Sequence, residues 1–254
     1  MVISRRQALK QATVAAVLAQ GVIAPAAAAQ PKRQIRLVIL DIGGTIIEDH
    51  GEVPNAMHAA LARHGVDVSF AEIADWRGAS KREMVRHFIE LRKGSADPSL
   101  VTNVYDQFVD QMNKAYEKLR PIDGAEDAMS QMRRDGYILA TTTGFDRPVT
   151  EMILGRLGWK HFFVASITSD DVVDGRPAPY MLFHAMEAAR VDNVGEAIAI
   201  GDTPLDIQAA NNGGLAAAIG VYSGAATEER LRKEKYSHIL ASVASLPALL
   251  RSGV

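Results

Sequence analysis

Two runs of apolar residues in this sequence end on carboxylates, which are side chains that can hold a metal ion or act on a substrate. The run 37–40 ends on Asp41, and a Gly-Gly-Thr turn follows closely. The run 197–201 ends before Asp202, and a second carboxylate, Asp206, lies four residues further on. A buried strand that delivers an Asp to its carboxyl end, just before a sharp turn, presents a catalytic group to a crevice in open α/β sheets. Carboxylates spaced like Asp202 and Asp206 can hold Mg²⁺ directly and through water, although a helix-capping role for Asp202 is an open alternative.

Two further loops carry groups that suit a phosphoryl oxygen. Thr142, Thr143 and Gly144 follow a predicted strand and offer hydroxyls and exposed backbone N–H groups. Arg176 stands between Gly and Pro and can supply a cation to a dianionic phosphate. Each motif also has an ordinary interpretation, as a Thr-rich strand end in the first case and as a proline turn with a solvated Arg in the second.

The order of predicted elements explains how these loops can meet. Predicted strands lie at 37–40, 137–142, 162–165, 197–201, 216–221 and 238–239, and predicted helices lie at 125–134, 148–157, 180–190, 205–212, 227–235 and 243–250. Strands that alternate with helices predict an α/β fold with a doubly wound parallel sheet. Right-handed crossovers then place the loops that follow the strands on one edge of the sheet.

The region 48–122 differs from its surroundings because it contains only helical patterns. The long stretch 97–120 begins with Asp-Pro, an N-cap followed by a proline in the first turn, and repeats apolar residues at helical spacing. We therefore predict an inserted all-helical cap at 48–122, between two segments of one core domain, 30–47 and 123–254.

The composition and the N-terminal segment indicate what kind of protein this is and where it is located. The chain has 254 residues, a net charge of -2, 48% apolar residues and no cysteine, which is ordinary for a globular protein and gives no sign of nucleic-acid binding. Residues 1–29 combine adjacent arginines, an uncharged Ala-rich run and small residues at the end, a pattern that resembles a twin-arginine export signal. We therefore expect a periplasmic protein with no stable membrane anchor after the signal is cleaved.

Taken together, the strand-end motifs are specific. Asp41 with its Gly-Thr turn, a Thr before Gly144, the basic Arg176, and the pair Asp202 and Asp206 occur in this order. This pattern resembles the haloacid dehalogenase superfamily over essentially all of the chain after the N-terminal segment. The resemblance implies a Rossmann-like core, Asp41 as the nucleophile, an aspartyl-phosphate intermediate, and Mg²⁺. The chemistry agrees, because a carboxylate that attacks a phosphoryl dianion needs its charge offset by a metal and by cations.

The residue at position 43 indicates which branch of this superfamily the chain resembles. Phosphatases of this superfamily carry a second Asp two residues after the nucleophile, where this chain has Gly43. The missing general acid–base is usually worth ~10²–10⁴ in rate. The phosphonatase-like branch, which includes phosphonoacetaldehyde hydrolases, does without that Asp and cleaves a carbon–phosphorus bond with the help of a cap lysine that forms a Schiff base. Lys81 lies three residues after Gly78 in the predicted cap, where that lysine is expected.

Two positions depart from that branch. Its hydrolases carry a His three residues after the lysine and a Tyr after Thr-Thr-Gly, whereas this chain has Met84 and Phe145. Proton transfer would then need other groups, and Glu48, Asp49 and His50 in the first loop are candidates. The predicted site residues are, for catalysis, Asp41 and Lys81; for phosphate, Thr142, Thr143, Gly144 and Arg176; and for the metal, Asp41, Gly43 through its carbonyl, Asp202 and Asp206.

Three functions stay open at this point. The leading prediction is a Mg²⁺-dependent hydrolase of a small phosphonate such as phosphonoacetaldehyde. A phosphatase for a small organophosphate ester is the first alternative, and a phosphate- or phosphonate-binding protein without turnover is the second. Lys81 has an alternative role of its own, as a surface lysine paired with a neighbouring Glu. The family resemblance also suggests a homodimer.

Overall fold

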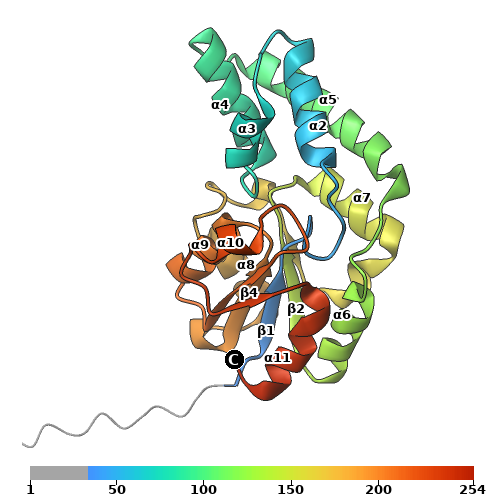
Figure 1. Cartoon of the computed structure of the whole chain (residues 1–254), viewed down its shortest axis with the longest axis vertical. Coiled ribbons are helices and arrows are strands. Elements are labelled where there is room, and N and C mark those ends of the chain that lie inside the picture. Colours follow the sequence, from blue (N-terminus) through green and yellow to red (C-terminus); the bar gives the residue numbers. More distant parts are fainter. Residues whose placement is uncertain (1–33) are drawn as a thin grey trace, which may run out of the picture. The chain divides into compact units, whose positions relative to one another are not determined.

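The computed structural model describes residues 34–254 (Figure 1). The predicted export signal at 1–29 lies outside the described residues and stays a prediction. Within 34–254, none of the helices combines the length and the apolar character that crossing a bilayer requires.

The core of residues 34–254 is built on one sheet of six parallel strands in the order β3-β2-β1-β4-β5-β6. The strands are β1 (Leu37–Leu40), β2 (Ile138–Thr142), β3 (Ser166–Ile167), β4 (Ala197–Gly201), β5 (Ala217–Val221) and β6 (His238–Leu240). The strand order reverses direction between β1 and β4, and in doubly wound sheets this switch point is where a ligand crevice opens. The predicted α/β fold with a parallel sheet is confirmed.

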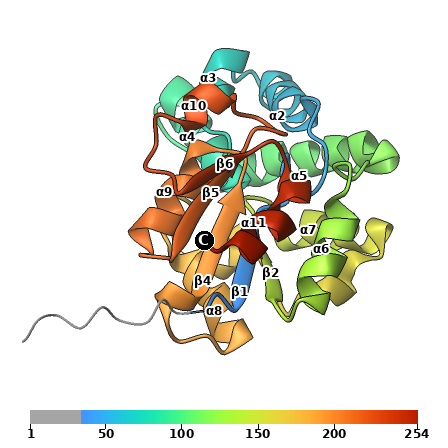
Figure 2. The same cartoon turned by 60° about the horizontal axis from the view of Figure 1, so that its bottom comes forward.

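Helices cover both faces of this sheet (Figure 2). The helices of the core are α6 (Ala125–Arg134), α7 (Arg147–Leu157), α8 (Tyr180–Ala189), α9 (Pro204–Asn212), α10 (Glu228–Leu231) and α11 (Leu246–Ser252). Side chains of β1 alternate between two buried clusters. Val38 and Leu40 pack with α6, α7 and α11, and Leu37 and Ile39 pack with α8, α9 and α10. Because both faces are covered, β1 is apolar at every position, as expected for a central parallel strand.

Three predicted elements differ from the structure. The strand predicted at 162–165 starts later, at Ser166, because Trp159–Phe162 forms a short 3₁₀ turn that buries Trp159 and Phe162 in the core. The helix predicted at 227–235 is a single turn, α10. The last predicted helix begins at Leu246 instead of at 243, after another 3₁₀ turn.

Above the carboxyl ends of the strands, four helices form the region between β1 and α6 (Figure 1). They are α2 (Glu52–Arg63), α3 (Phe70–Asp75), α4 (Lys81–Lys93) and α5 (Pro98–Ala115). Asp97 caps α5 before Pro98, as the sequence predicts, and Ser69 and Glu72 form a capping box on α3. Helix α5 stops five residues short of the predicted end because 116–118 tightens into a 3₁₀ turn that leads back to the core.

The two connections between the helical cap and the core run side by side. Ile47 and Pro121 form an isolated antiparallel bridge, and the backbone N–H of Ile122 donates to the carbonyl of Ile46 at 3.0 Å. This paired linker starts only five residues after Asp41, so the cap is attached next to the end of β1. The cap also contacts the core through the loop 76–80, which lies between α3 and α4 and which we call the cap loop.

Candidate active site

Asp41 lies at the carboxyl end of β1, at the switch point of the sheet, and is buried. Its Oδ1 accepts a hydrogen bond from Nη2 of Arg176 at 2.6 Å, and its Oδ2 accepts one from the hydroxyl of Thr45 at 3.3 Å. The sequence places Thr45 four residues later, and the turn through the two glycines brings it back to the carboxylate. Residues of the core therefore orient both oxygens of the Asp41 carboxylate, the predicted nucleophile.

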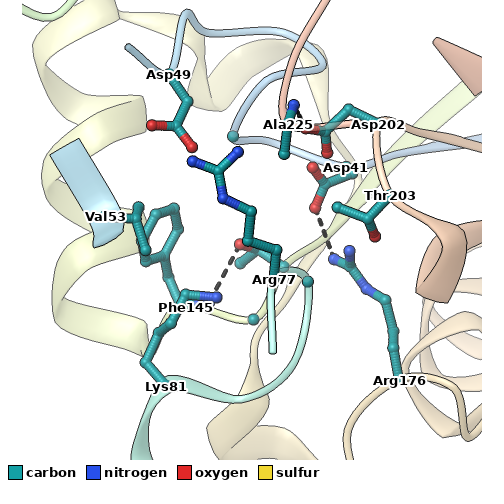
Figure 3. Close-up of a pocket in the computed structure, with 14 residues that line it drawn as sticks. Asp41, Asp49, Val53, Arg77, Lys81, Phe145, Arg176, Asp202, Thr203 and Ala225 are labelled. Carbon is teal, nitrogen blue, oxygen red and sulfur yellow. Dashed lines mark hydrogen bonds and ion pairs between the residues drawn. The ribbon is translucent and has the colours of Figure 1, made fainter. Parts of the chain in front are cut away.

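Arg176 joins Asp41, to which Figure 3 shows its bond, to a second carboxylate of the predicted metal site. Its second nitrogen, Nη1, pairs with Oδ1 of Asp206, and the whole side chain is buried. The other oxygen of Asp206 accepts from the backbone N–H and the hydroxyl of Thr203, at 3.1 and 2.6 Å. The interpretation of Arg176 as a solvated residue of a proline turn is therefore wrong. Asp206 is held at both oxygens, which suits the supporting role predicted for it.

The third carboxylate, Asp202, completes an acidic cluster. Ligand oxygens of Asp41, Asp202 and Asp206 all lie within 4.8 Å of one another, and Asp202 accepts the backbone N–H of Ala225 at 2.5 Å. Burial, together with the charges of Asp41 and Asp206, raises the pKa of Asp202 well above its usual range. Burial likewise raises the pKa of Asp41 to about 6, although the guanidinium of Arg176 opposes the shift.

Three buried carboxylates with one buried guanidinium between them form a site that lacks positive charge. Carboxylate oxygens this close to one another are the donor set that hard divalent cations prefer. The residues therefore fit a bound metal ion. Gly43, whose carbonyl is predicted as a further ligand, lines the same cavity. The alternative of a purely capping role for Asp202 does not account for its position in this cluster.

The Thr-Thr-Gly motif is divided between two sides of β2. Thr143 and Gly144 line the cavity that contains Asp41, and the Thr143 hydroxyl accepts the backbone N–H of Phe145 at 3.2 Å. Thr142 does not reach this cavity and instead lines a small space beside Met181, behind Arg176. Successive side chains of a strand point to opposite faces, so the prediction that Thr142 binds phosphate beside Thr143 is corrected here.

Lys81 is the first residue of α4 and lies buried in the same cavity as Asp41. Its amine donates to the carbonyl of Ala79 at 2.8 Å and lies 5.5 Å from the centroid of the Phe145 ring. Desolvation, and secondarily the charge of Arg176, lowers the pKa of Lys81 to about 8. The alternative of a surface lysine paired with a Glu is wrong. A buried amine close to neutrality is the form in which a lysine acts as a nucleophile.

Close contacts at two glycines hold the cap loop against the core, and no residue pattern predicts them. A Cβ added at Gly78, where φ is +88°, would come within 2.5 Å of the Thr203 hydroxyl, and one at Gly144 would overlap the carbonyl of Ala79. In addition, the backbone N–H of Lys81 donates to the carbonyl of Gly144 at 3.2 Å. Gly144 therefore acts as a seat for the cap loop as well as lining the cavity.

Phe145 is a further residue of the cavity that pattern analysis did not assign to it. A Cβ at Gly43 would lie 3.6 Å from its Cε2, so the ring packs over the position where related phosphatases carry an acid. Of the three candidates for proton transfer in the first loop, only Asp49 lines this cavity. Glu48 and His50 form a hydrogen-bonded pair at 2.8 Å and line a different surface pocket.

The geometry brings a nucleophilic carboxylate, a cation, a metal-binding cluster and a buried amine around one space of about 40 Å³. Such a volume has room for about three water molecules or for one small anionic group. A family model of haloacid dehalogenase-like hydrolases matches residues 35–214. The chain belongs to this family. The resemblance inferred from the strand-end motifs is thereby confirmed, and the protein is a hydrolase.

Among relatives of this haloacid dehalogenase-like hydrolase, the phosphonoacetaldehyde hydrolase of Paraburkholderia xenovorans is 28% identical over 197 residues, which are 72% of this chain and 73% of the relative. The phosphonoacetaldehyde hydrolase of Nitratidesulfovibrio vulgaris is 29% identical and covers 71% of this chain and 69% of its own length. The crystal structure of a phosphonoacetaldehyde hydrolase-like protein from Oleispira antarctica superimposes with a TM-score of 0.76 at 19% identity, over 87% of this chain and 93% of that one.

Proposed function

We propose that this hydrolase cleaves the carbon–phosphorus bond of a small phosphonate that carries a carbonyl group, such as phosphonoacetaldehyde. Asp41 would accept the phosphoryl group, and Lys81 would form an imine with the carbonyl carbon. The observation that carries the proposal is the buried amine of Lys81, with a pKa near 8, in the same cavity as the Asp41 carboxylate. The curated relatives named above support it.

The role of the imine follows from what the carbon side must do when the bond breaks. The amine of Lys81 adds to the aldehyde and water leaves, which gives a protonated imine. As the Asp41 oxygen bonds to phosphorus, the electron pair of the C–P bond moves onto this imine and forms an enamine. A proton at carbon and one water then release acetaldehyde and the free amine, and a second water releases phosphate from Asp41.

We further propose that the metal is Mg²⁺, held by Asp41, Asp202 and the carbonyl of Gly43, with Asp206 in support. When bound, the ion would offset the charge of the phosphoryl oxygens as the carboxylate approaches. Arg176, which already donates to Asp41 at 2.6 Å, and Thr143 would hold the other phosphoryl oxygens. Asp49 is the titratable side chain of the first loop that is placed to move a proton on the carbon side.

Borohydride trapping tests the imine directly. Incubation with phosphonoacetaldehyde and borohydride should attach a two-carbon adduct to Lys81, found by mass spectrometry of the digested protein. Lys81→Arg keeps the positive charge but cannot form the adduct, whereas Lys93→Met, at an exposed site at the other end of α4, should leave trapping unchanged. Full activity in Lys81→Arg without any adduct in the wild type would exclude the mechanism.

A phosphatase acting on a small organophosphate ester is the second candidate. The presence of Asp49 in the cavity favours it, because a carboxylic acid there could protonate a leaving oxygen in place of the residue missing at position 43. A panel of phosphate esters and phosphonates decides between the two functions. Release of phosphate from esters alone, with loss of that activity in Asp49→Asn, would support the phosphatase.

A further inference from the structure

Arg77 is a cation in the active-site cavity that no predicted role explains. It belongs to the cap loop, directly before Gly78, and it lines the cavity together with Asp41 and Lys81. Figure 3 shows its side chain running through the middle of the view, with the guanidinium turned toward Asp49. The residue is partly exposed, so it can meet a ligand that enters from solvent.

The three cations that line this cavity differ in their partners. Arg176 pairs with Asp41 and Asp206, and the amine of Lys81 donates to a carbonyl. Within residues 34–254, the Arg77 guanidinium has neither an ion pair nor a hydrogen bond; only its backbone N–H is bonded, to the carbonyl of Ala74 at 3.2 Å. Asp49, toward which the guanidinium is turned in Figure 3, uses its Oδ1 to accept the backbone N–H of Gly51 at 2.9 Å.

Arg77 also lines a second cavity next to the small one. A larger cavity of about 460 Å³ lies between cap and core, and it shares Arg77, Thr203 and Ala225 with the small one. A substrate with its phosphoryl group at Asp41 and its reactive carbon at Lys81 would fill the small cavity. Of the residues shared by the two cavities, Arg77 is the one with a charged side chain, so a substituent that extends from the small cavity toward the larger one would meet it.

We propose that Arg77 binds a carboxylate on the organic part of the substrate, so that the enzyme acts on small phosphonates or phosphates that carry a carboxylate group. A guanidinium offers two parallel N–H donors that match the two oxygens of a carboxylate, and the resulting charge-assisted pair is among the stronger polar contacts. The inference rests on the proposed function only for the position of the phosphoryl group at Asp41.

Calorimetric titration with two unreactive ligands tests the inference without turnover. Phosphonoacetate and ethylphosphonate share a phosphonate group and a two-carbon chain, but only the first carries a carboxylate. In buffer with Mg²⁺, Arg77→Met should reduce the affinity for phosphonoacetate by about 10- to 100-fold and change that for ethylphosphonate less than threefold. Comparing variants cancels the affinity of each ligand for the metal. Arg77→Lys, which keeps the charge but loses the fork, should fall between wild type and Arg77→Met.

Arg230→Met is the matched control. Arg230 lines the larger cavity but not the small one, and its guanidinium already pairs with Glu234 at 2.8 Å, so its loss should leave the preference for phosphonoacetate unchanged. Equal losses for both ligands in Arg77→Met would assign Arg77 to the phosphonate group, and no loss for either would assign it to solvent. Either result overturns the inference, as does an equal effect of Arg230→Met.

Kinetics with matched substrates separates this inference from the proposed function. 3-Phosphonopyruvate is phosphonoacetaldehyde with a carboxylate in place of the aldehyde hydrogen, and phosphoglycolate is ethyl phosphate with a carboxylate in place of the methyl group. We expect the carboxylate member of the reactive pair to have the higher kcat/KM, and Arg77→Met to reverse this order. If neither phosphonate is cleaved, the proposed C–P chemistry fails, while the phosphate pair and the calorimetry still decide the role of Arg77.

Discussion

The strand ends of the core and the cap loop contribute to the same cavity in different ways. On the core side, Asp41, Asp206 and Arg176 are buried and bonded to one another through side-chain atoms. On the cap side, Arg77 has no side-chain partner among the described residues, and Lys81 is bonded only to a backbone carbonyl. The core thus presents a network that is already assembled, whereas the cap presents two cations that are open to a ligand.

This difference indicates that the core and the cap have different roles in catalysis. The phosphoryl group is common to the phosphonate and phosphate substrates proposed above, so the groups that bind it can be held in place by the sheet and by each other. The organic part varies between substrates, and loops on a rigid scaffold are where such specificity is usually placed. We therefore expect changes in the core to abolish turnover of every substrate, and changes in the cap to alter which substrate is used.

The largest effect should come from the core. Asp41→Asn keeps the size of the side chain but removes the nucleophile, so turnover of phosphonates and phosphate esters alike should fall by roughly 10⁴-fold or more. The variant should still bind ethylphosphonate in calorimetry, because Arg176 and Thr143 remain. Substantial turnover of either substrate by this variant would place the nucleophile elsewhere.

The next effect should separate the two regions. Lys81→Met removes the amine but keeps an unbranched apolar chain, so cleavage of phosphonoacetaldehyde should fall by roughly 10²–10⁴-fold. Hydrolysis of phosphate esters, which needs no imine, should change by less than about tenfold. The ratio of the two rates is the quantity to measure, and parallel losses would mean that Lys81 serves the phosphoryl group instead of the carbon side.

Most of the core site could be predicted from the sequence because parallel strands end at one edge. That rule brings Asp41, Arg176, Asp202 and Asp206 together from four distant parts of the chain without knowledge of any contact. Thr142 was the exception, because the last strand residue and the first loop residue point to opposite sides.

The cap side could be predicted only in part. Lys81 was found because its spacing from Gly78 follows a family pattern. Arg77 and Phe145 were not assigned to the cavity, and Asp49 was one of three candidates in the first loop, because these positions depend on how three loops close over the core. The seat of the cap loop on Gly144 is a steric fit between backbones 65 residues apart in sequence, and no pattern of residue types signals such a fit.

Restoring the missing acid should move the enzyme toward ester hydrolysis. Gly43 has an ordinary φ, and a Cβ there makes only normal contact with Phe145, so Gly43→Asp can be accommodated. Phosphate-ester turnover should rise by about tenfold or more, because a general acid–base is usually worth ~10²–10⁴ in rate. Gly43→Asn, which has nearly the same shape but no acidic proton, is the control and should give no gain.

Gly144→Ala should loosen the contact between the two regions. The added methyl would overlap the Ala79 carbonyl, so the cap loop must shift, at a cost of about 1–3 kcal/mol in the free energy of unfolding and about tenfold in kcat/KM. Gly155→Ala is the matched control: it lies in α7 with only the Lys160 side chain nearby, at 3.9 Å, so it should be neutral or slightly stabilising. Equal behaviour of the two variants would mean that the seat is dispensable.

The smallest effect concerns the pH dependence of the wild-type rate, which should report on Lys81 of the cap. Burial and the charge of Arg176 lower the pKa of Lys81 to about 8, while the charges of Asp41, Asp49 and Asp202 act in the opposite direction. The neutral, nucleophilic fraction of the amine is then about a tenth at pH 7 and about nine tenths at pH 9. The rate of phosphonate cleavage should therefore rise about tenfold between these pH values and then level off.

The free energy of unfolding should also depend on the titration of Lys81, and the direction of this pH dependence can be measured separately from the rate. The folded-state pKa of Lys81 lies below the unfolded value of 10.5, so below pH 8 burial of the charged amine destabilises the fold, and this cost fades as the pH rises from about 8 toward 10.5. In Lys81→Met, the free energy of unfolding should lose that part of its pH dependence. A phosphonate rate that is half-maximal near pH 8 and levels off above about pH 9 in the wild type, together with a flatter stability profile in Lys81→Met, would assign both effects to one buried amine. A rate that is constant from pH 6 to pH 9 would instead show that the amine is not the group that reacts.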